Sequence, residues 1–194
     1  EREKELGGYF MELGGWERAH GYAANEHLLK KYGNRVPVRE NEWDNRHFWR
    51  VSNAEHLAMS EDCGIVNLSH FYMFDVEGPD HVALMEWICA AKIGGDPNIG
   101  KGIYTHFLDD EGMVRADFTA FRMADRIRMV NGADAGPRDF HYMRRVAQDR
   151  GFDVTITDVA EKFVTIGIWG PNARENLAKV VEDVSPLTAR DFEL

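Results

Sequence analysis

Residues 103–123 read IYTHFLDDEGMVRADFTAFRM, and this stretch predicts a β-hairpin. Its first arm is aromatic and β-branched, and the Asp-Asp-Glu-Gly sequence at 109–112 is typical of a turn. Along the second arm a two-residue period assigns the side chains to two faces: Val114, Ala116, Phe118 and Ala120 on one, and Arg115, Asp117 and Thr119 on the other. Asp117 therefore stands in mid-strand, where aspartate is disfavoured. The residues alone favour a solvated carboxylate that pairs with Arg115.

The glycine-rich stretch before the hairpin, GGDPNIGKG at 94–102, contains a G-x-x-x-x-G-K pattern similar to that of a phosphate-binding loop. Such a loop needs a strand before it and a helix after it. Here a helical pattern precedes, strand-like residues follow, and Gly102 stands where a magnesium-binding Ser or Thr is required. We therefore interpret the stretch as a connection from a helix into the hairpin.

The rest of the chain alternates between helical and strand patterns. We predict helices at 16–31, 43–59 and 138–150, the last ended by Gly151, and a loop at 34–42. We predict further strands at 65–68, 71–77, 126–130, 154–158 and 163–169. These patterns predict an α+β fold, with antiparallel or mixed sheets and packed helices.

A unit of strand, Gly-Pro-Asp or Gly-Pro-Asn, and helix appears twice, which suggests two similar halves. In the first copy the helix is expected to begin at Pro79, with one apolar face formed by Leu84, Trp87, Ile88 and Ala91. In the second copy the helix follows Pro171, with an apolar face formed by Ala173, Leu177, Val180 and Val181.

Composition excludes several classes of function. The 33 acidic and 23 basic residues give a net charge of −10, which argues against a nucleic-acid partner because phosphate binding requires a basic face. No apolar run is long enough to span a bilayer, so we expect a soluble protein without a membrane partner. Two cysteines favour a reducing compartment. The eight histidines form no H-E-x-x-H motif and no i, i+4 pair, so we expect no metal site.

Four stretches together resemble a known family. The hairpin is preceded by NLSHFYMFDVEGPD at 67–80 and followed by IRMVNGAD at 127–134 and VTIGIWGPNARENLAKV at 164–180. In order and spacing these resemble the folate-dependent aminomethyltransferase (glycine-cleavage T-protein) superfamily, most closely the tetrahydrofolate domain of dimethylglycine and sarcosine dehydrogenases and oxidases. The resemblance implies the N-terminal portion of the aminomethyltransferase folate-binding fold. We then expect an N-terminal helical lead-in at 1–62 and the first part of the folate-binding domain at 63–194.

The resemblance also implies roles for individual residues. Asp117 falls on the family's catalytic acid/base aspartate, and Asn131 on an asparagine that contacts the pterin. Tyr104 and Phe71 match positions that line the pocket. From the residues alone, Asn131 before Gly132 is also an ordinary turn pair, and the two aromatic residues are also ordinary core residues. Arg122, within the basic group Arg115, Arg122, Arg126 and Arg128, is a candidate for holding the anionic folate tail, although a solvated basic strand pair explains it equally well.

The implied activity is tetrahydrofolate-dependent one-carbon transfer. An N-methyl or aminomethyl donor presents a one-carbon unit as an iminium or methylene adduct, and tetrahydrofolate captures it to give 5,10-methylenetetrahydrofolate. The alternatives are a folate-dependent O- or S-demethylase and a folate-binding or scaffold module without turnover. FAD, if N-methyl oxidation occurs, is expected on another domain or partner chain, because no G-x-G-x-x-G is present. The family's pterin-gripping segment and C-terminal barrel are expected beyond residue 194, and the location is expected to be cytoplasmic, or the mitochondrial matrix in a eukaryote.

Overall fold

The computed structural model describes residues 1–13, 15–38, 49–132 and 134–184. Contacts group the chain into two compact units, one formed by residues 1–66 and 166–194 and the other by residues 67–165. Within the described ranges, no helix is both long and apolar enough to cross a membrane. The expected division of the chain at 62/63 stays a prediction.

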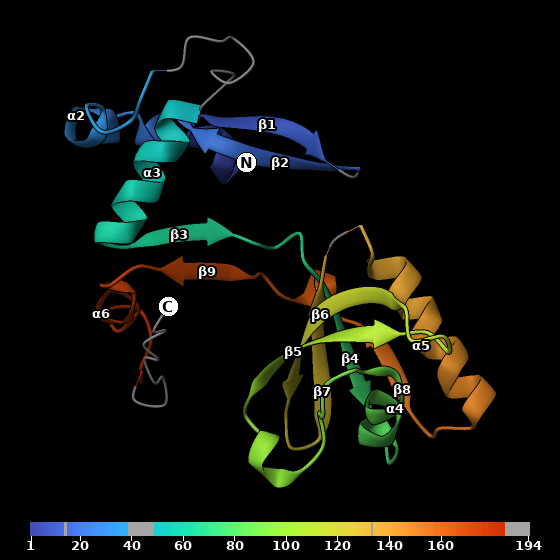
Figure 1. Cartoon of the computed structure of the whole chain (residues 1–194). Helices are drawn as coiled ribbons and strands as arrows, with labels where there is room; N and C mark the ends of the chain where they lie inside the picture. The colour runs from blue at the N-terminus through green and yellow to red at the C-terminus, as the bar shows by residue number, and fades with distance from the viewer. Residues whose placement is uncertain (14, 39–48, 133, 185–194) are drawn as a thin grey trace. The chain divides into compact units, whose positions relative to one another are not determined.

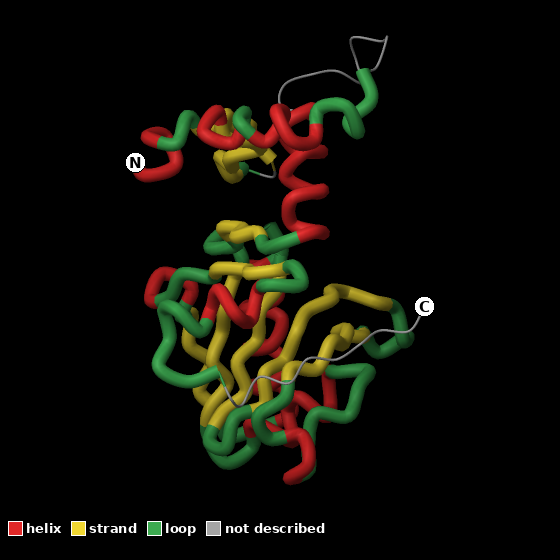
Figure 2. The backbone as a smooth tube through the Cα atoms, turned by 90° about the vertical axis from the view of Figure 1, so that its left-hand side faces the viewer, coloured by secondary structure: helices red, strands yellow, loops and turns green. Residues whose placement is uncertain are grey.

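The unit at 67–165 contains a five-stranded antiparallel sheet in the order β5-β6-β7-β4-β8 (Figure 1). Its strands are β4 (Tyr72–Glu77), β5 (Gly102–Leu108), β6 (Val114–Arg122), β7 (Arg126–Asn131) and β8 (Thr155–Asp158). Helix α4 (His81–Ile88) connects β4 to β5, and α5 (Gly136–Arg150) connects β7 to β8. Short 3-10 turns lie at Asp96–Asn98 and Ala160–Lys162. Figure 2 shows the strands running side by side. The predicted α+β class and the predicted hairpin are confirmed.

Both helices pack against one face of this sheet. Leu84, Met85 and Ile88 of α4 and Met143 and Ala147 of α5 are buried in one cluster with side chains from β4, β5, β6 and β7. Because full burial of such a side chain contributes roughly 1.5–3 kcal/mol, this cluster determines which face of the sheet is covered. In the described residues of this unit no α-helix packs on the opposite face, where Phe163, next to the 3-10 turn at Ala160–Lys162, covers Arg128.

Three predicted details of this unit are wrong. The pairing of β5 with β6 shifts between Phe107 and Leu108, so Val114 lies opposite Leu108 and is exposed rather than buried with Ala116. Such a bulge inserts an extra residue and breaks the two-residue period. Helix α4 begins at His81, two residues after Pro79, and ends before Ala91. Trp87 is 55% exposed, and its ring lies 4.3 Å from the guanidinium carbon of Arg150 instead of in the core.

Helix α5 follows its predicted course. Pro137 lies in its first turn, where the missing N–H has no partner within the helix. Gly151 ends the helix in the left-handed conformation, with φ of +74°, which glycine adopts without the steric cost of a Cβ. The Phe152 N–H then donates to the Ala147 carbonyl, which closes the last turn.

The described residues of the unit at 1–66 and 166–194 form two small two-stranded sheets. One pairs β1 (Gly8–Leu13) with β2 (Trp16–Tyr22), and the other pairs β3 (Gly64–Asn67) with β9 (Ile166–Trp169). The helical elements are α1 (Arg2–Glu5), a 3-10 turn at Ala23–Asn25, α2 (Leu28–Tyr32), α3 (Trp49–Glu61) and α6 (Ala173–Leu177). A small core contains Tyr32, Val36 and Ala54.

The predicted helix at 16–31 is wrong over its first half, because residues 16–22 pair with Gly8–Leu13 as a β-hairpin. The structure thus also contradicts a purely helical lead-in at 1–62. The helix at 43–59 is confirmed from residue 49, and the loop at 34–42 is confirmed to residue 38; the remaining residues of both lie outside the described ranges. Helix α6 ends at Leu177, so the apolar face expected to include Val180 and Val181 is wrong, and both are exposed.

Candidate functional site

The face of the five-stranded sheet that points away from α4 and α5 carries the polar residues of the hairpin. We call it the open face, and it includes Asp75, Tyr104, His106, Asp117, Thr119, Phe121 and Arg128. Asp117 lies directly opposite His106, and Tyr104 lies directly opposite Thr119. Directly paired residues share one face of a sheet, so these four side chains are neighbours. Asp117 is exposed, as the two-residue period predicts.

Tyr104 holds the Asp117 carboxylate. The Tyr104 hydroxyl donates to Oδ2 of Asp117 over 3.0 Å, across the diagonal of the β5–β6 pair. This hydrogen bond raises the pKa of the Tyr104 phenol, since ionisation would remove the donor and place two negative charges side by side. The phenol therefore remains a donor at neutral pH and restricts the orientation of the carboxylate.

A titration tests this contact. We expect a tyrosine ionisation above the usual pKa of about 10 that is absent in Tyr104→Phe. The raised pKa reflects a preference for the protonated phenol, so the hydrogen bond is intact below pH 10 and is lost as the pH rises through the pKa of Tyr104. The tyrosinate absorbance measures this step. In Asp117→Ala the step should move back toward pH 10, and an unmoved step would show that the contact does not form.

His106 is a site residue that we did not predict. Its ring lies edge-on to Tyr104, with 5.3 Å between the ring centroids, and the residue is half-buried. The signal was present, because the two-residue period that starts at Tyr104 places His106 on the same face. The open face therefore brings together a phenol, an imidazole and a carboxylate.

Two other predicted site residues lie on the helix-covered side. Asn131 is 4% exposed, and its side-chain nitrogen donates to Oδ2 of Asp139 on α5 over 2.9 Å. Arg122 is 8% exposed, and its guanidinium donates to the Met123 carbonyl. The structure does not bring either residue beside Asp117. Their contacts with folate stay predictions.

Phe71 lies in the turn before β4, half-buried and edge-on to His70. The adjacent Tyr72 pairs with Asn131 of β7, which pairs in turn with Phe118 of β6. Phe71 is therefore at the same end of the sheet as Asp117, two strands away. Its role in lining the pocket stays a prediction.

The four arginines do not form a free basic cluster. Arg115 lies 4.6 Å from the Tyr142 ring centroid rather than pairing with Asp117. Arg128 donates to both oxygens of Asp75, over 2.7 and 2.8 Å, and the Phe163 ring lies 4.2 Å from its guanidinium carbon. Arg126 forms ion pairs with Asp75, Glu77 and Asp125. These pairs neutralise much of the positive charge on this part of the open face.

No group of three or more His, Cys, Asp and Glu side chains arranged to hold a metal ion occurs in the part of the chain that the structure describes. The open face presents a carboxylate acceptor, a phenol donor and an imidazole, and the 41% exposed ring of Phe121 lies four residues from Asp117 along β6.

Comparison with known proteins identifies the family to which this chain belongs. Residues 1–193 match the GCVT N-terminal domain. The chain is 30% identical over 180 residues to 4-methylaminobutanoate oxidase (formaldehyde-forming) of Paenarthrobacter nicotinovorans, covering 92% of this chain and 20% of that protein. It is 34% identical over 121 residues to an aminomethyltransferase of Bordetella avium, covering 62% of this chain and 33% of that protein.

Dimethylglycine dehydrogenase of Rattus norvegicus is 26% identical over 173 residues, which is 88% of this chain and 19% of that protein. The chain thus spans a third or less of these curated relatives. The crystal structure of glycine cleavage system aminomethyltransferase T from Bartonella henselae superposes with a TM-score of 0.71 at 22% identity, over 92% of this chain and 41% of that one. The predicted fold and the predicted resemblance are both confirmed, and the chain belongs to the GCVT N-terminal domain family.

Proposed function

We propose that this chain contributes the acid/base carboxylate, Asp117, to tetrahydrofolate-dependent one-carbon transfer from an N-methyl or aminomethyl donor. The observation that carries the proposal is the exposed Asp117 carboxylate, held by the Tyr104 hydroxyl on an open sheet face. The family supports it. The names of the three relatives denote an aminomethyl group, dimethylglycine and a methylamino acid, all of which carry a one-carbon group on nitrogen.

The open face fits a folate. The exposed Tyr104 and Phe121 rings offer flat surfaces to a pterin, and Asp117 offers an acceptor to its amines. Tetrahydrofolate, when bound, supplies the amine nitrogens that receive the one-carbon unit. In the described residues the sheet is antiparallel and contains no β-α-β dinucleotide unit, so a flavin that oxidises an N-methyl group would belong to another domain or chain.

The role of Asp117 follows from its charge and position. A carboxylate within about 2.6–3.2 Å of an amine accepts its proton as the new C–N bond forms. The same negative charge stabilises a cationic one-carbon unit beside it. Tyr104 orients the carboxylate, and His106 stands on the neighbouring strand, so the group is positioned before a ligand arrives.

The donor can be identified directly in the intact protein. We expect sarcosine or dimethylglycine ¹³C-labelled in the N-methyl group, supplied with tetrahydrofolate, the flavin-containing domain or chain that oxidises the N-methyl group and an electron acceptor that reoxidises the flavin, to give ¹³C-labelled 5,10-methylenetetrahydrofolate by mass spectrometry. Label transferred only from O- or S-methyl donors would instead identify a demethylase. Folate binding without transfer from any donor would identify a binding module, and the catalytic proposal would then be wrong.

A further inference from the structure

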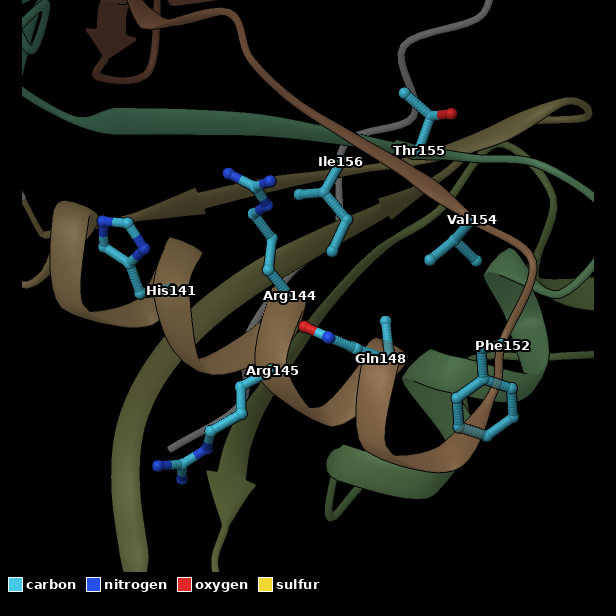
Figure 3. Close-up of a pocket in the computed structure, with 9 residues that line it drawn as sticks. His141, Arg144, Arg145, Gln148, Phe152, Val154, Thr155 and Ile156 are labelled. Carbon is cyan, nitrogen blue, oxygen red and sulfur yellow. The ribbon is translucent and has the colours of Figure 1, made fainter.

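A groove lies between α5 and β8, in the unit at 67–165. It has a volume of about 830 Å³, which is within the range of pockets that hold small molecules. Figure 3 shows its lining residues, with His141, Arg144, Arg145 and Gln148 on α5 and Thr155 and Ile156 on β8. Because α5 packs on the helix-covered side of the sheet, the groove is separate from the open face that carries Asp117.

The floor of the groove is apolar and its rim carries hydrogen-bond donors. Ala147, Phe152, Val154 and Ile156 are buried or half-buried and form the apolar part. The rim offers two guanidinium groups, an imidazole, an amide and a hydroxyl. In Figure 3 Arg144 extends from α5 on the side of Ile156, and Arg145 extends the other way. Arg144 is thus the cation best placed over the floor.

The lining of this groove carries basic side chains without acidic ones. No Asp or Glu lines it. Among the described residues, neither Arg144 nor Arg145 forms an ion pair with a carboxylate; their guanidinium groups lie near the rings of Phe140 and Tyr142 instead. Arg144 therefore places an unpaired positive charge beside the apolar floor.

A second groove on the same helix provides the contrast. It has a volume of about 640 Å³ and contains Arg115, Arg145 and Arg150, but Asp109, Asp110, Glu111 and Asp149 also line it. Its acidic and basic groups can compensate one another, so it offers no net attraction to an anion. Of these two grooves, the α5–β8 groove is the one whose lining contains cations and no carboxylate.

We infer that the α5–β8 groove binds an oxyanion with an apolar body, either a carboxylate or a phosphate ester, at a site separate from the proposed folate site. The Arg144 guanidinium donates to the oxyanion in a fork that suits either group. His141, Gln148 and Thr155 supply further donors, and Phe152, Val154 and Ile156 pack against the apolar body.

Calorimetric titration of the intact protein tests this site. The probes are phenyl phosphate for the phosphate class and phthalate for the carboxylate class, with inorganic phosphate as the probe that lacks an apolar body. We expect one-site binding of at least one aromatic probe, weaker binding of inorganic phosphate, and lower affinity at higher salt. In Arg144→Gln the affinity for that probe should fall about tenfold or more, because a charge-assisted hydrogen bond is lost.

Arg150→Gln is the matched control. It removes the same charge from the same helix, but Arg150 lies against Trp87 and lines only the second groove. The affinity of the Arg150→Gln variant for the aromatic probe should stay within about twofold of that of the parent protein. Asp117→Asn should also leave anion binding unchanged. Circular dichroism checks that each variant is folded. Equal losses in Arg144→Gln and Arg150→Gln, absence of binding by both aromatic probes, or equal binding of inorganic phosphate would overturn the proposal.

Discussion

Asp117→Asn should lower the rate of one-carbon transfer by about 10²–10⁴-fold, the range expected when a general acid/base is removed. Asparagine has nearly the same volume, and its amide oxygen can still accept from the Tyr104 hydroxyl. The substitution therefore removes the charge and the basicity while leaving the local contacts. Because Asp117 is exposed on the open face, the fold should not change. Turnover and folate binding should be measured in the intact protein, with binding affected far less than turnover.

Asp110→Asn is the control for this substitution. Asp110 is an exposed acid in the turn of the same hairpin. Its replacement by asparagine changes the net charge by the same amount as Asp117→Asn but leaves the open face unaltered. The transfer rate of Asp110→Asn should match that of the parent protein. The rate of Tyr104→Phe should lie between those of Asp117→Asn and Asp110→Asn, because the carboxylate remains but loses the hydroxyl that orients it. A parental rate in Asp117→Asn would remove Asp117 from the mechanism.

Asp75→Asn should lower the free energy of unfolding by about 3 kcal/mol, the low end of the range for removing one partner of a buried ion pair. The Asp75 side chain is 6% exposed and receives two hydrogen bonds from Arg128, which is 19% exposed. The substitution leaves the Arg128 guanidinium largely desolvated without its countercharge. Because water still reaches part of Arg128, we do not expect the upper end of the range. Urea unfolding measures the difference.

Glu77→Gln is the control for Asp75. Glu77 pairs with Arg126 on the same two strands, but its side chain is 41% exposed. Water screens such a pair, so the loss should be below about 1 kcal/mol. Equal losses for the two substitutions would show that burial does not determine the strength of the Asp75 pair.

The parts of the fold that local pattern predicted are those that local interactions form. The hairpin around residues 109–112 and the end of α5 at Gly151 depend on neighbouring residues, and both are present. The strand at 16–22 was missed because its strand character comes from pairing with residues 8–13, which were not recognised as a strand. Trp87 was misplaced because its apolar ring was assumed to face the core, whereas it contacts Arg150 from another helix.

For the site, sequence alone determined that Asp117 and Phe118 point to opposite faces of one strand, because side-chain alternation is a property of the extended backbone. It also determined the family resemblance that assigns Asp117 its proposed role. Only the tertiary structure decided which face is covered, because that depends on where α4 and α5 pack. The same packing buries Asn131 against Asp139 and leaves Asp117 exposed beside Tyr104 and His106. It also forms the groove between α5 and β8, which no periodic pattern in the sequence predicts.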